Sequence, residues 1–137
     1  MRTLVIIIWA IILLIFTCAS NSQFWKMGEL PTFHWSPDPN FHELTDLNLR
    51  HTSRFIVQKI GHFLGFSLLG ILIYWRSRNI ILSIVISVMY AILTEFLQLY
   101  FGRDGRIYDV IIDTAGILLG MLIIKIIQRG SQPILRE

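Results

Sequence analysis

Charged residues are scarce in this sequence. Asp, Glu, Lys and Arg make up only 15% of the 137 residues, whereas 54% are hydrophobic, and the mean hydropathy is +0.62. This apolar fraction exceeds what the core of a small soluble domain can bury. The polar residues are also clustered, which leaves long apolar runs. The composition therefore excludes an ordinary soluble protein and predicts an integral membrane protein that forms a single domain over residues 1–137.

Several functional motifs are also missing. A single cysteine, Cys18, excludes an internal disulfide. The net charge is only +3 and the basic residues flank the apolar runs, so we expect no nucleic-acid partner. The sequence contains no Gly-rich phosphate loop and no recognisable nucleophile motif. We therefore expect no cofactor and assign no catalytic residue.

Four apolar runs are candidates for transmembrane helices. A helix needs about 20 mostly apolar residues to cross the roughly 30 Å hydrocarbon core of a bilayer. The runs that come close to this length are residues 4–19, 56–75, 80–101 and 110–127. They are too long for strands and do not alternate apolar with polar residues. The sequence thus predicts an all-α membrane protein, a four-transmembrane-helix bundle.

The first run also resembles a secretion signal. Arg2 precedes it, and the small residues "CAS" at its end imitate the cleavage site of a signal peptide. A lipoprotein signal ending at Cys18 is a further alternative, although Phe16 and Thr17 match its consensus poorly. We expect the first helix to be retained, with cleavage and lipidation as the alternatives.

The basic residues at the helix ends predict the orientation in the membrane. With the N-terminus inside, each side carries six of the 12 Lys and Arg residues. Those on the inner side lie in short segments, whereas several on the outer side lie in a long loop, where the positive-inside rule weakens. We therefore expect both termini in the cytoplasm and residues 20–55 in an extracytoplasmic loop.

The loop of residues 20–55 is expected to contact the membrane surface. Its aromatic residues lie among prolines, and such aromatic side chains favour the lipid headgroup region. Asn40 can cap a short helix that carries Glu43 three residues later. The apolar residues that fall on one side of this helix are Phe41, Leu44 and Leu47. This pattern predicts a short interfacial helix.

The histidines do not form a metal-binding pattern. His34, His42 and His51 are eight and nine residues apart, unlike any compact set of metal ligands. We therefore expect no metal site.

Polar and small residues form one stripe on each of the last three runs. In residues 80–101 the stripe contains Ser83, Ser87, Ala91, Thr94, Glu95 and Gln98. In the last run it contains Asp109, which directly precedes residues 110–127, and then Asp113, Gly116 and Gly120. In residues 56–75 it contains Lys59, Gly61, His62 and Gly65. Small residues let membrane helices approach closely. We therefore expect the stripes to face one another and the glycines to pack the helices together, namely Gly61, Gly65, Gly116 and Gly120.

The charged members of these stripes converge on one face of the membrane. They lie at the start of the second run, the end of the third and the start of the fourth, and these ends share one side in either orientation. Ionisable groups inside a membrane are functional candidates by default. We expect a ligand-binding cluster at the outer face, made of Lys59, His62, Glu95, Gln98, Arg103, Arg106, Asp109 and Asp113. The alternative is a structural cluster in which Glu95 pairs with a neighbouring cation and pins the helices together.

Three blocks of the sequence match a family pattern. "SNSQ" (Ser20–Gln23) is similar to the stretch after the family's first helix, and "KIGHFLGFSLLG" (Lys59–Gly70) to its K-x-x-H-F segment. "EFLQLYFGRDGRIYDVIIDTAGILLG" (Glu95–Gly120) is similar to its E-x-x-Q, Arg, Asp, N-x-x-G-x-x-x-G signature. On these blocks the chain resembles the VanZ-like family of small bacterial membrane proteins. Two residues depart from the pattern: Gln58 stands where an acid commonly precedes the lysine, and Asp113 stands where the family has Asn.

The resemblance implies a function in the bacterial cell envelope, because the family is named after a protein associated with teicoplanin resistance. The positions that match its characteristic polar residues are Lys59, His62, Glu95, Gln98, Arg106 and Asp109. We expect a non-enzymatic protein among membrane lipids that binds a lipid-linked cell-wall precursor or a lipoglycopeptide. The alternatives are an intramembrane His/Glu acid–base enzyme acting on a polyprenyl-linked substrate, and a scaffold or transporter subunit that forms a homo-oligomer.

Overall fold

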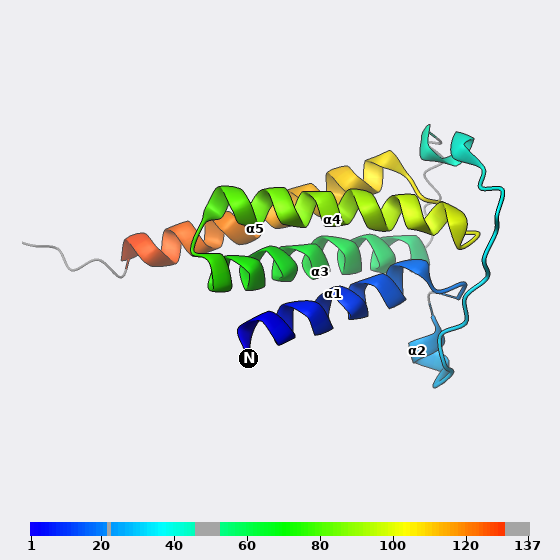
Figure 1. The fold of residues 1–137 in the computed structure, drawn as a ribbon, viewed down its shortest axis with the longest axis horizontal. Coiled ribbons are helices and arrows are strands. Elements are labelled where there is room, and N and C mark those ends of the chain that lie inside the picture. The colour runs from blue at the N-terminus through cyan, green and yellow to red at the C-terminus, as the bar shows by residue number, and fades with distance from the viewer. Residues whose placement is uncertain (22, 46–52, 131–137) are drawn as a thin grey trace, which may run out of the picture.

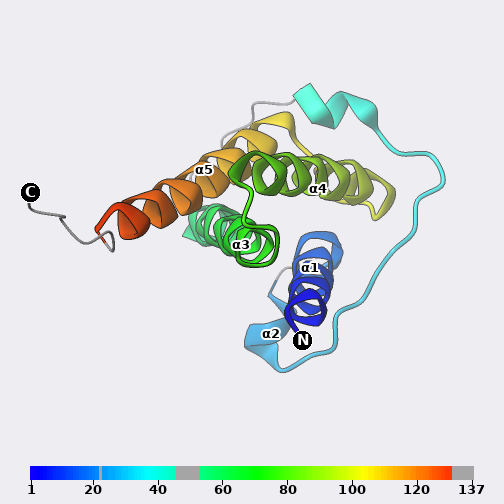
Figure 2. The same ribbon diagram turned by 60° about the vertical axis from the view of Figure 1, so that its left-hand side comes forward.

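Four long helices form one bundle in the computed structural model, which describes residues 1–21, 23–45 and 53–130. The long helices are α1 (Arg2–Cys18), α3 (Ser53–Ser77), α4 (Ile80–Tyr100) and α5 (Ile107–Gly130). The short helix α2 (Phe24–Met27) and the 3-10 helix η1 (Phe41–Thr45) lie between α1 and α3 in the chain. α3 contacts each of the other long helices (Figure 1 and Figure 2). The described residues contain no strand, which confirms the all-α prediction.

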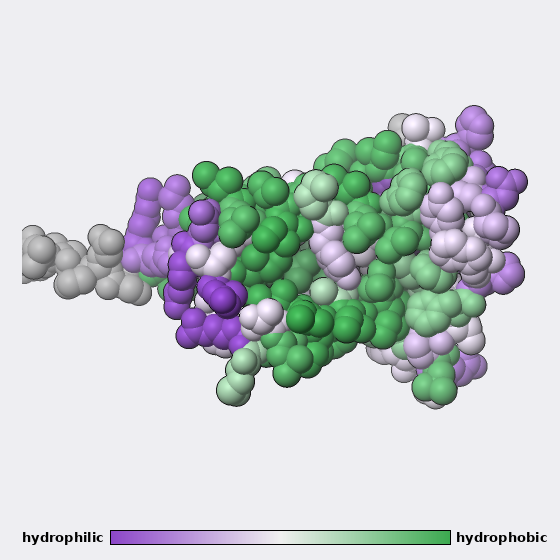
Figure 3. Space-filling view, viewed as in Figure 1, coloured by the Kyte–Doolittle hydropathy of each residue, from purple (hydrophilic) through white to green (hydrophobic). Residues whose placement is uncertain are grey.

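Within the part of the chain that the structure describes, three helices are long and apolar enough to cross a membrane: Ile56–Ser77, Ile80–Tyr100 and Ile107–Gly130. Figure 3 shows a hydrophobic band on the surface of the bundle, with polar residues gathered at its two ends. α1 is also apolar, but its 17 residues extend over only about 26 Å. The structure therefore has three clear candidate spans and one shorter apolar helix.

The helix bounds agree with the sequence-based expectation to within three residues. The last long helix, α5, begins at Ile107 rather than at residue 110, so Asp109 lies in its first turn. An acid there interacts favourably with the exposed N–H groups of the helix start. At the start of α4 the Asn79 side chain accepts a hydrogen bond from the Leu82 N–H at 3.0 Å.

Two glycines shape the turn between α4 and α5. Gly102 has a φ of 63°, a left-handed conformation that glycine adopts without steric cost. A Cβ at Gly105 would overlap the carbonyl oxygen of Glu95. The chain therefore folds back tightly onto the end of α4, which brings Arg106 beside Glu95.

The loop that precedes α3 packs over the end of α4. The Trp35 ring stacks on Tyr100 with 5.3 Å between the ring centroids. The Phe41 ring lies 6.1 Å from Phe96. The aromatic residues of the described part of the loop thus contact the bundle itself.

The segment predicted to form an interfacial helix has Asn40 at its start. Asn40 Oδ1 accepts a hydrogen bond from the His42 N–H at 3.2 Å, and Asn40 Nδ2 donates to Glu43 Oε1 at 3.3 Å. The segment is a 3-10 helix of five residues, and Leu47, expected on its apolar side, lies outside the described residues.

The apolar core of the bundle includes residues from all four long helices, namely Leu13, Phe66, Leu69, Ile73, Ala91 and Ile117. Two hydrogen bonds also hold α1 against the helices that form this core. Trp9 Nε1 donates to the carbonyl oxygen of Gly65 at 3.0 Å, and the Tyr90 hydroxyl donates to that of Ala10 at 2.6 Å. α1 is therefore held by polar contacts as well as by apolar packing.

The glycines of α5 allow a close approach to α3. A Cβ at Gly116 would overlap the backbone of Phe63, and a Cβ at Gly120 would lie 2.8 Å from Ser67 Oγ. The G-x-x-x-G motif thus packs two helices of the same chain.

The glycines of α3 differ from each other. A Cβ at Gly65 would lie 2.6 Å from Cδ2 of Leu13 in α1. A Cβ at Gly61 would meet no atom of the described residues within 4 Å, so the expected close packing is not found there. Gly61 instead lines a cavity.

Candidate functional site

A buried cluster of polar side chains lies at one end of the bundle. It consists of His62 from α3, Glu95 and Gln98 from α4, and Asp109 and Asp113 from α5. The exposed fraction is 6% for His62 and at most 2% for the other four residues. The stripes predicted from the sequence therefore meet inside the bundle, and we call these five residues the buried cluster.

The imidazole of His62 lies between two carboxylates. Its Nδ1 is 3.3 Å from Asp113 Oδ1 and 3.7 Å from Glu95 Oε1. One side chain from each of three helices thus meets at a single point.

Glu95 accepts hydrogen bonds from two further groups. Gln98 Nε2 donates to its Oε1 at 2.5 Å, and the backbone N–H of Arg106 donates to its Oε2 at 3.0 Å. The expected partner Arg106 therefore binds Glu95 through its main chain. The Arg106 guanidinium contacts Asp104 at 2.8 Å and donates to the Tyr108 hydroxyl at 2.7 Å.

Lys59 and Asp109 form an ion pair beside the cluster. The Lys59 ammonium lies 2.5 Å from both carboxylate oxygens of Asp109 and 4.8 Å from the centre of the Tyr108 ring. The Lys59 side chain is 14% exposed, so water reaches the pair from one side. This pair links the second turn of α3 to the first turn of α5.

Arg103 binds α1 rather than the cluster. Its Nη1 donates to the carbonyl oxygen of Ala19 at 2.5 Å, which ties the end of α1 to the turn after α4. Burial lowers the pKa of Arg103, and nearby acidic groups oppose this change. A guanidinium stays charged under such conditions, so the contact is a charge-assisted hydrogen bond.

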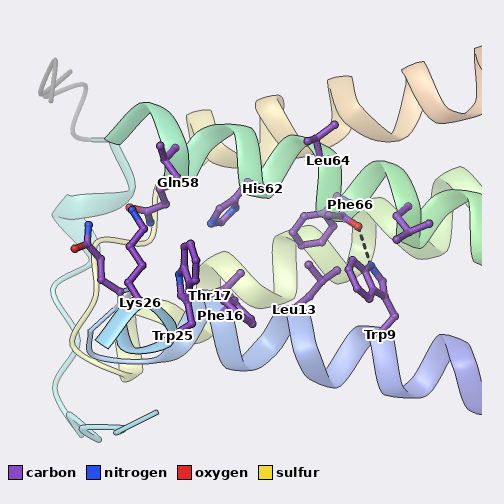
Figure 4. A pocket seen from close by; sticks show the side chains of 15 residues that line it. Trp9, Leu13, Phe16, Thr17, Trp25, Lys26, Gln58, His62, Leu64 and Phe66 are labelled. Carbon is purple, nitrogen blue, oxygen red and sulfur yellow. Dashed lines mark hydrogen bonds between the residues drawn. The ribbon is translucent and has the colours of Figure 1, made fainter. Parts of the chain in front are cut away.

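A cavity of about 410 Å³ opens between α1, α2 and α3. Figure 4 shows the His62 side chain pointing from α3 into this space, opposite Thr17 and Trp25. Trp9, Leu13 and Phe16 line the cavity further along α1, and Gln23, Lys26 and Gln58 line it near the loop. His62 therefore belongs both to the buried cluster and to the cavity wall.

Most of the cavity residues were not among the sequence-based candidates. In the sequence the residues of α1 form one uniform apolar run, and the aromatic residues of the loop, which include Trp25, are predicted to face the lipid headgroups. No sequence signal distinguishes these residues, because Gly61 is predicted to pack against a helix and the open space beside it is a property of the structure.

The model of the VanZ/LLP1 family matches residues 3–128. The chain belongs to this VanZ-like family. It is 32% identical over 120 residues to "Uncharacterized membrane protein YwnJ" of Bacillus subtilis (strain 168), and the alignment covers 85% of each chain. No solved structure matches the chain.

The residues that resemble the polar positions of the VanZ-like pattern lie in one region of the structure. Lys59, His62, Glu95, Gln98 and Asp109 all lie in or beside the buried cluster. Arg106, the remaining position, contributes a main-chain N–H to it. Residues that are up to 50 positions apart in sequence thus form one set of contacts, as between Lys59 and Asp109.

Proposed function

We propose that this VanZ-like protein binds one amphipathic lipid, with the lipid chain in the cavity and the polar head at the cavity end nearest the loop. A lipid-linked cell-wall intermediate has this chemistry, and so does the acylated end of a lipoglycopeptide. The observation that carries the proposal is the two-part lining of the cavity.

The larger part of the cavity is apolar. Trp9, Leu13 and Phe16 line it from α1, and its volume of about 410 Å³ is typical of a small-molecule site. A hydrocarbon chain bound in this part would contact side chains that are as apolar as the chain itself. The aromatic side chains supply a large contact area.

The end nearest the loop is polar. Gln23, Lys26 and Gln58 can donate hydrogen bonds to phosphate or sugar oxygens, and the Lys26 ammonium can pair with a phosphate. Lys59 and Arg106, the two cations among the residues that match the family's polar positions, already engage Asp109 and Asp104. We therefore propose that Lys26 makes the first contact with the anionic head of the lipid.

We also infer that α1 is a fourth span and that both termini are cytoplasmic. A helix of 17 residues is at the lower limit of about 17 for a membrane span. Arg2 lies against Trp75, with its guanidinium carbon 4.8 Å from the ring centre. Arg2 therefore joins the arginines of the α3–α4 turn at one end of the bundle, and a group of basic residues in short segments supports placing that end in the cytoplasm. The cluster and the polar end of the cavity then face outward.

A cavity that captures an acyl tail would contribute to teicoplanin resistance by holding the antibiotic away from its target. Expression of the protein in a sensitive bacterium should then lower sensitivity to an acylated glycopeptide. A glycopeptide without an acyl chain is the control, and equal protection against both compounds would contradict tail capture.

The experiment compares Gly61→Leu with Gly130→Leu. Neither position has a described atom within 4 Å of a new Cβ, but only Gly61 lines the cavity. Each protein is purified in detergent, and its bound lipids are identified by mass spectrometry. We expect an isoprenoid phosphate to be enriched in the wild type and in Gly130→Leu, and to fall about tenfold in Gly61→Leu, equivalent to about 1.4 kcal/mol. Equal lipid content in all three proteins would refute the cavity as the site.

One observation favours a second candidate, acid–base catalysis. His62 lines the cavity and its Nδ1 lies 3.7 Å from Glu95 Oε1, so a candidate acid–base pair stands next to the space proposed for a polyprenyl-linked substrate. Turnover of such a substrate by the purified protein, lost in Glu95→Gln, would support catalysis. A substrate that is bound but unchanged would support binding alone.

A further inference from the structure

Three buried side chains present metal-ligating atoms to one point. Atoms of His62, Glu95 and Asp113 that can bind a metal all lie within 4.8 Å of one another. They come from three different helices, and no short sequence motif connects them. We propose that these three residues bind one divalent transition-metal ion, for which Zn²⁺ is the probe.

The separations fit the coordination geometry of such an ion. Zn²⁺ binds imidazole nitrogen and carboxylate oxygen at about 2.0–2.2 Å, which sets two tetrahedral ligand atoms about 3.4 Å apart. His62 Nδ1 lies 3.3 Å from Asp113 Oδ1 and 3.7 Å from Glu95 Oε1. An ion can therefore reach all three residues with small side-chain movements.

The hydrogen bonds of the buried cluster leave a place for a cation. Asp113 is 0% exposed, and its Oδ1 accepts no hydrogen bond from the described residues. His62 Nδ1 has one position for a proton or a metal, and its hydrogen-bond contact is with Asp113 Oδ2 at 3.4 Å. A second carboxylate, Glu95, shares the same nitrogen, so one imidazole proton cannot satisfy both acids. A divalent ion would balance both carboxylates, which are otherwise costly to bury together.

Among the described residues, the nearby cations contact other groups directly, and the Arg106 guanidinium contacts Asp104. Lys59 is engaged with Asp109, and Arg103 donates to the Ala19 carbonyl oxygen. Gln98 and the Arg106 N–H hold the Glu95 carboxylate in position, as outer-shell groups hold ligands in known metal sites. Three protein ligands leave one position for water or for an oxygen of a bound molecule, and the cavity beside His62 gives access.

The test measures metal content in the full-length protein purified without a polyhistidine tag. The protein is treated with EDTA, reloaded with ZnCl₂, freed of excess metal by gel filtration and analysed by mass spectrometry of the elements. We expect about one Zn²⁺ per chain in the wild type and in the control His42→Gln, whose histidine lies in η1. We expect a loss of about tenfold or more in His62→Gln and in Asp113→Asn. A wild-type protein without Zn²⁺, or equal content in His62→Gln, would overturn the proposal.

A second measurement needs no variant and covers the case in which His62→Gln does not fold. Co²⁺ is titrated into the metal-free wild-type protein, and its visible absorption is recorded. We expect a band that saturates at about one equivalent and disappears when Zn²⁺ is added, because both ions accept the same nitrogen and oxygen ligands. Absence of a saturable band would overturn the proposal, since this readout does not depend on lipid binding or catalysis.

Discussion

Replacing Gly116 by alanine should force α3 and α5 apart. The new Cβ would overlap the carbonyl oxygen of Phe63 and lie 2.9 Å and 3.1 Å from its carbonyl carbon and Cα. These are backbone atoms, so no side-chain rotation relieves the overlap. Overpacking of this kind costs about 1–3 kcal/mol, and the higher helix propensity of alanine offsets up to about 1 kcal/mol of it. Because the contact joins two membrane helices along their length, we expect a net loss of stability.

Gly61→Ala is the matched control, because it makes the same change in the same bundle where a Cβ meets no described atom within 4 Å. It should stabilise the protein by up to about 1 kcal/mol through helix propensity alone. Thermal unfolding in detergent can be followed with a fluorogenic maleimide, since Cys18 is the only cysteine and is 1% exposed.

At about 3–5 °C for each kcal/mol in a chain of this size, Gly116→Ala should melt several degrees below the wild type, whereas Gly61→Ala should melt at or above it. If Gly116→Ala and Gly61→Ala have the same melting temperature, the close approach of α3 to α5 is not a feature of the folded protein.

Lys59→Met should destabilise the protein by about 2–3 kcal/mol because it leaves the Asp109 carboxylate buried without its cation, and adding Asp109→Asn should restore part of the loss in the same melting assay. Additive losses would show that the pair is not coupled. Asn79→Ala should cost about 1 kcal/mol by removing the cap of α4, and an unchanged melting temperature would contradict that role. In a Cys18→Ser background, a cysteine at Asp38 should react with a membrane-impermeant maleimide in intact cells, whereas one at Ser77 should react only after permeabilisation. The opposite pattern would place both termini outside.

The buried cluster could be predicted from the sequence because two simple rules locate it. Helical spacing places Glu95 and Gln98 on one face of α4, and Asp109 and Asp113 on one face of α5. The alternating direction of consecutive helices then places both faces at the same depth. Hydrocarbon excludes such side chains, so their faces must turn inward.

The individual contacts depend on backbone detail that residue spacing does not contain. The sequence places Arg106 near Glu95, but the tight turn at Gly105 presents the Arg106 N–H to the carboxylate and leaves the guanidinium beside Asp104. Gly61 and Gly65 have the spacing of a packing motif, yet only Gly65 meets another helix closely. That difference follows from the position of α1, which an apolar run does not specify.

His62 lines the proposed lipid cavity and is also a ligand of the proposed metal site, and one comparison of variants separates the two roles. Gly61→Leu fills the cavity and leaves all three metal-ligating residues unchanged, so it should lose bound lipid and retain Zn²⁺. His62→Gln removes a metal ligand from the cavity wall, so it should lose Zn²⁺. Its lipid content then shows whether the head of the lipid contacts the ion, because a phosphate oxygen can take the fourth position of a three-ligand site. If EDTA treatment of the wild type and the His62→Gln substitution both release the lipid, the metal ion takes part in lipid binding. If EDTA leaves the lipid in place, the ion stabilises the bundle and the cavity binds lipid independently of it.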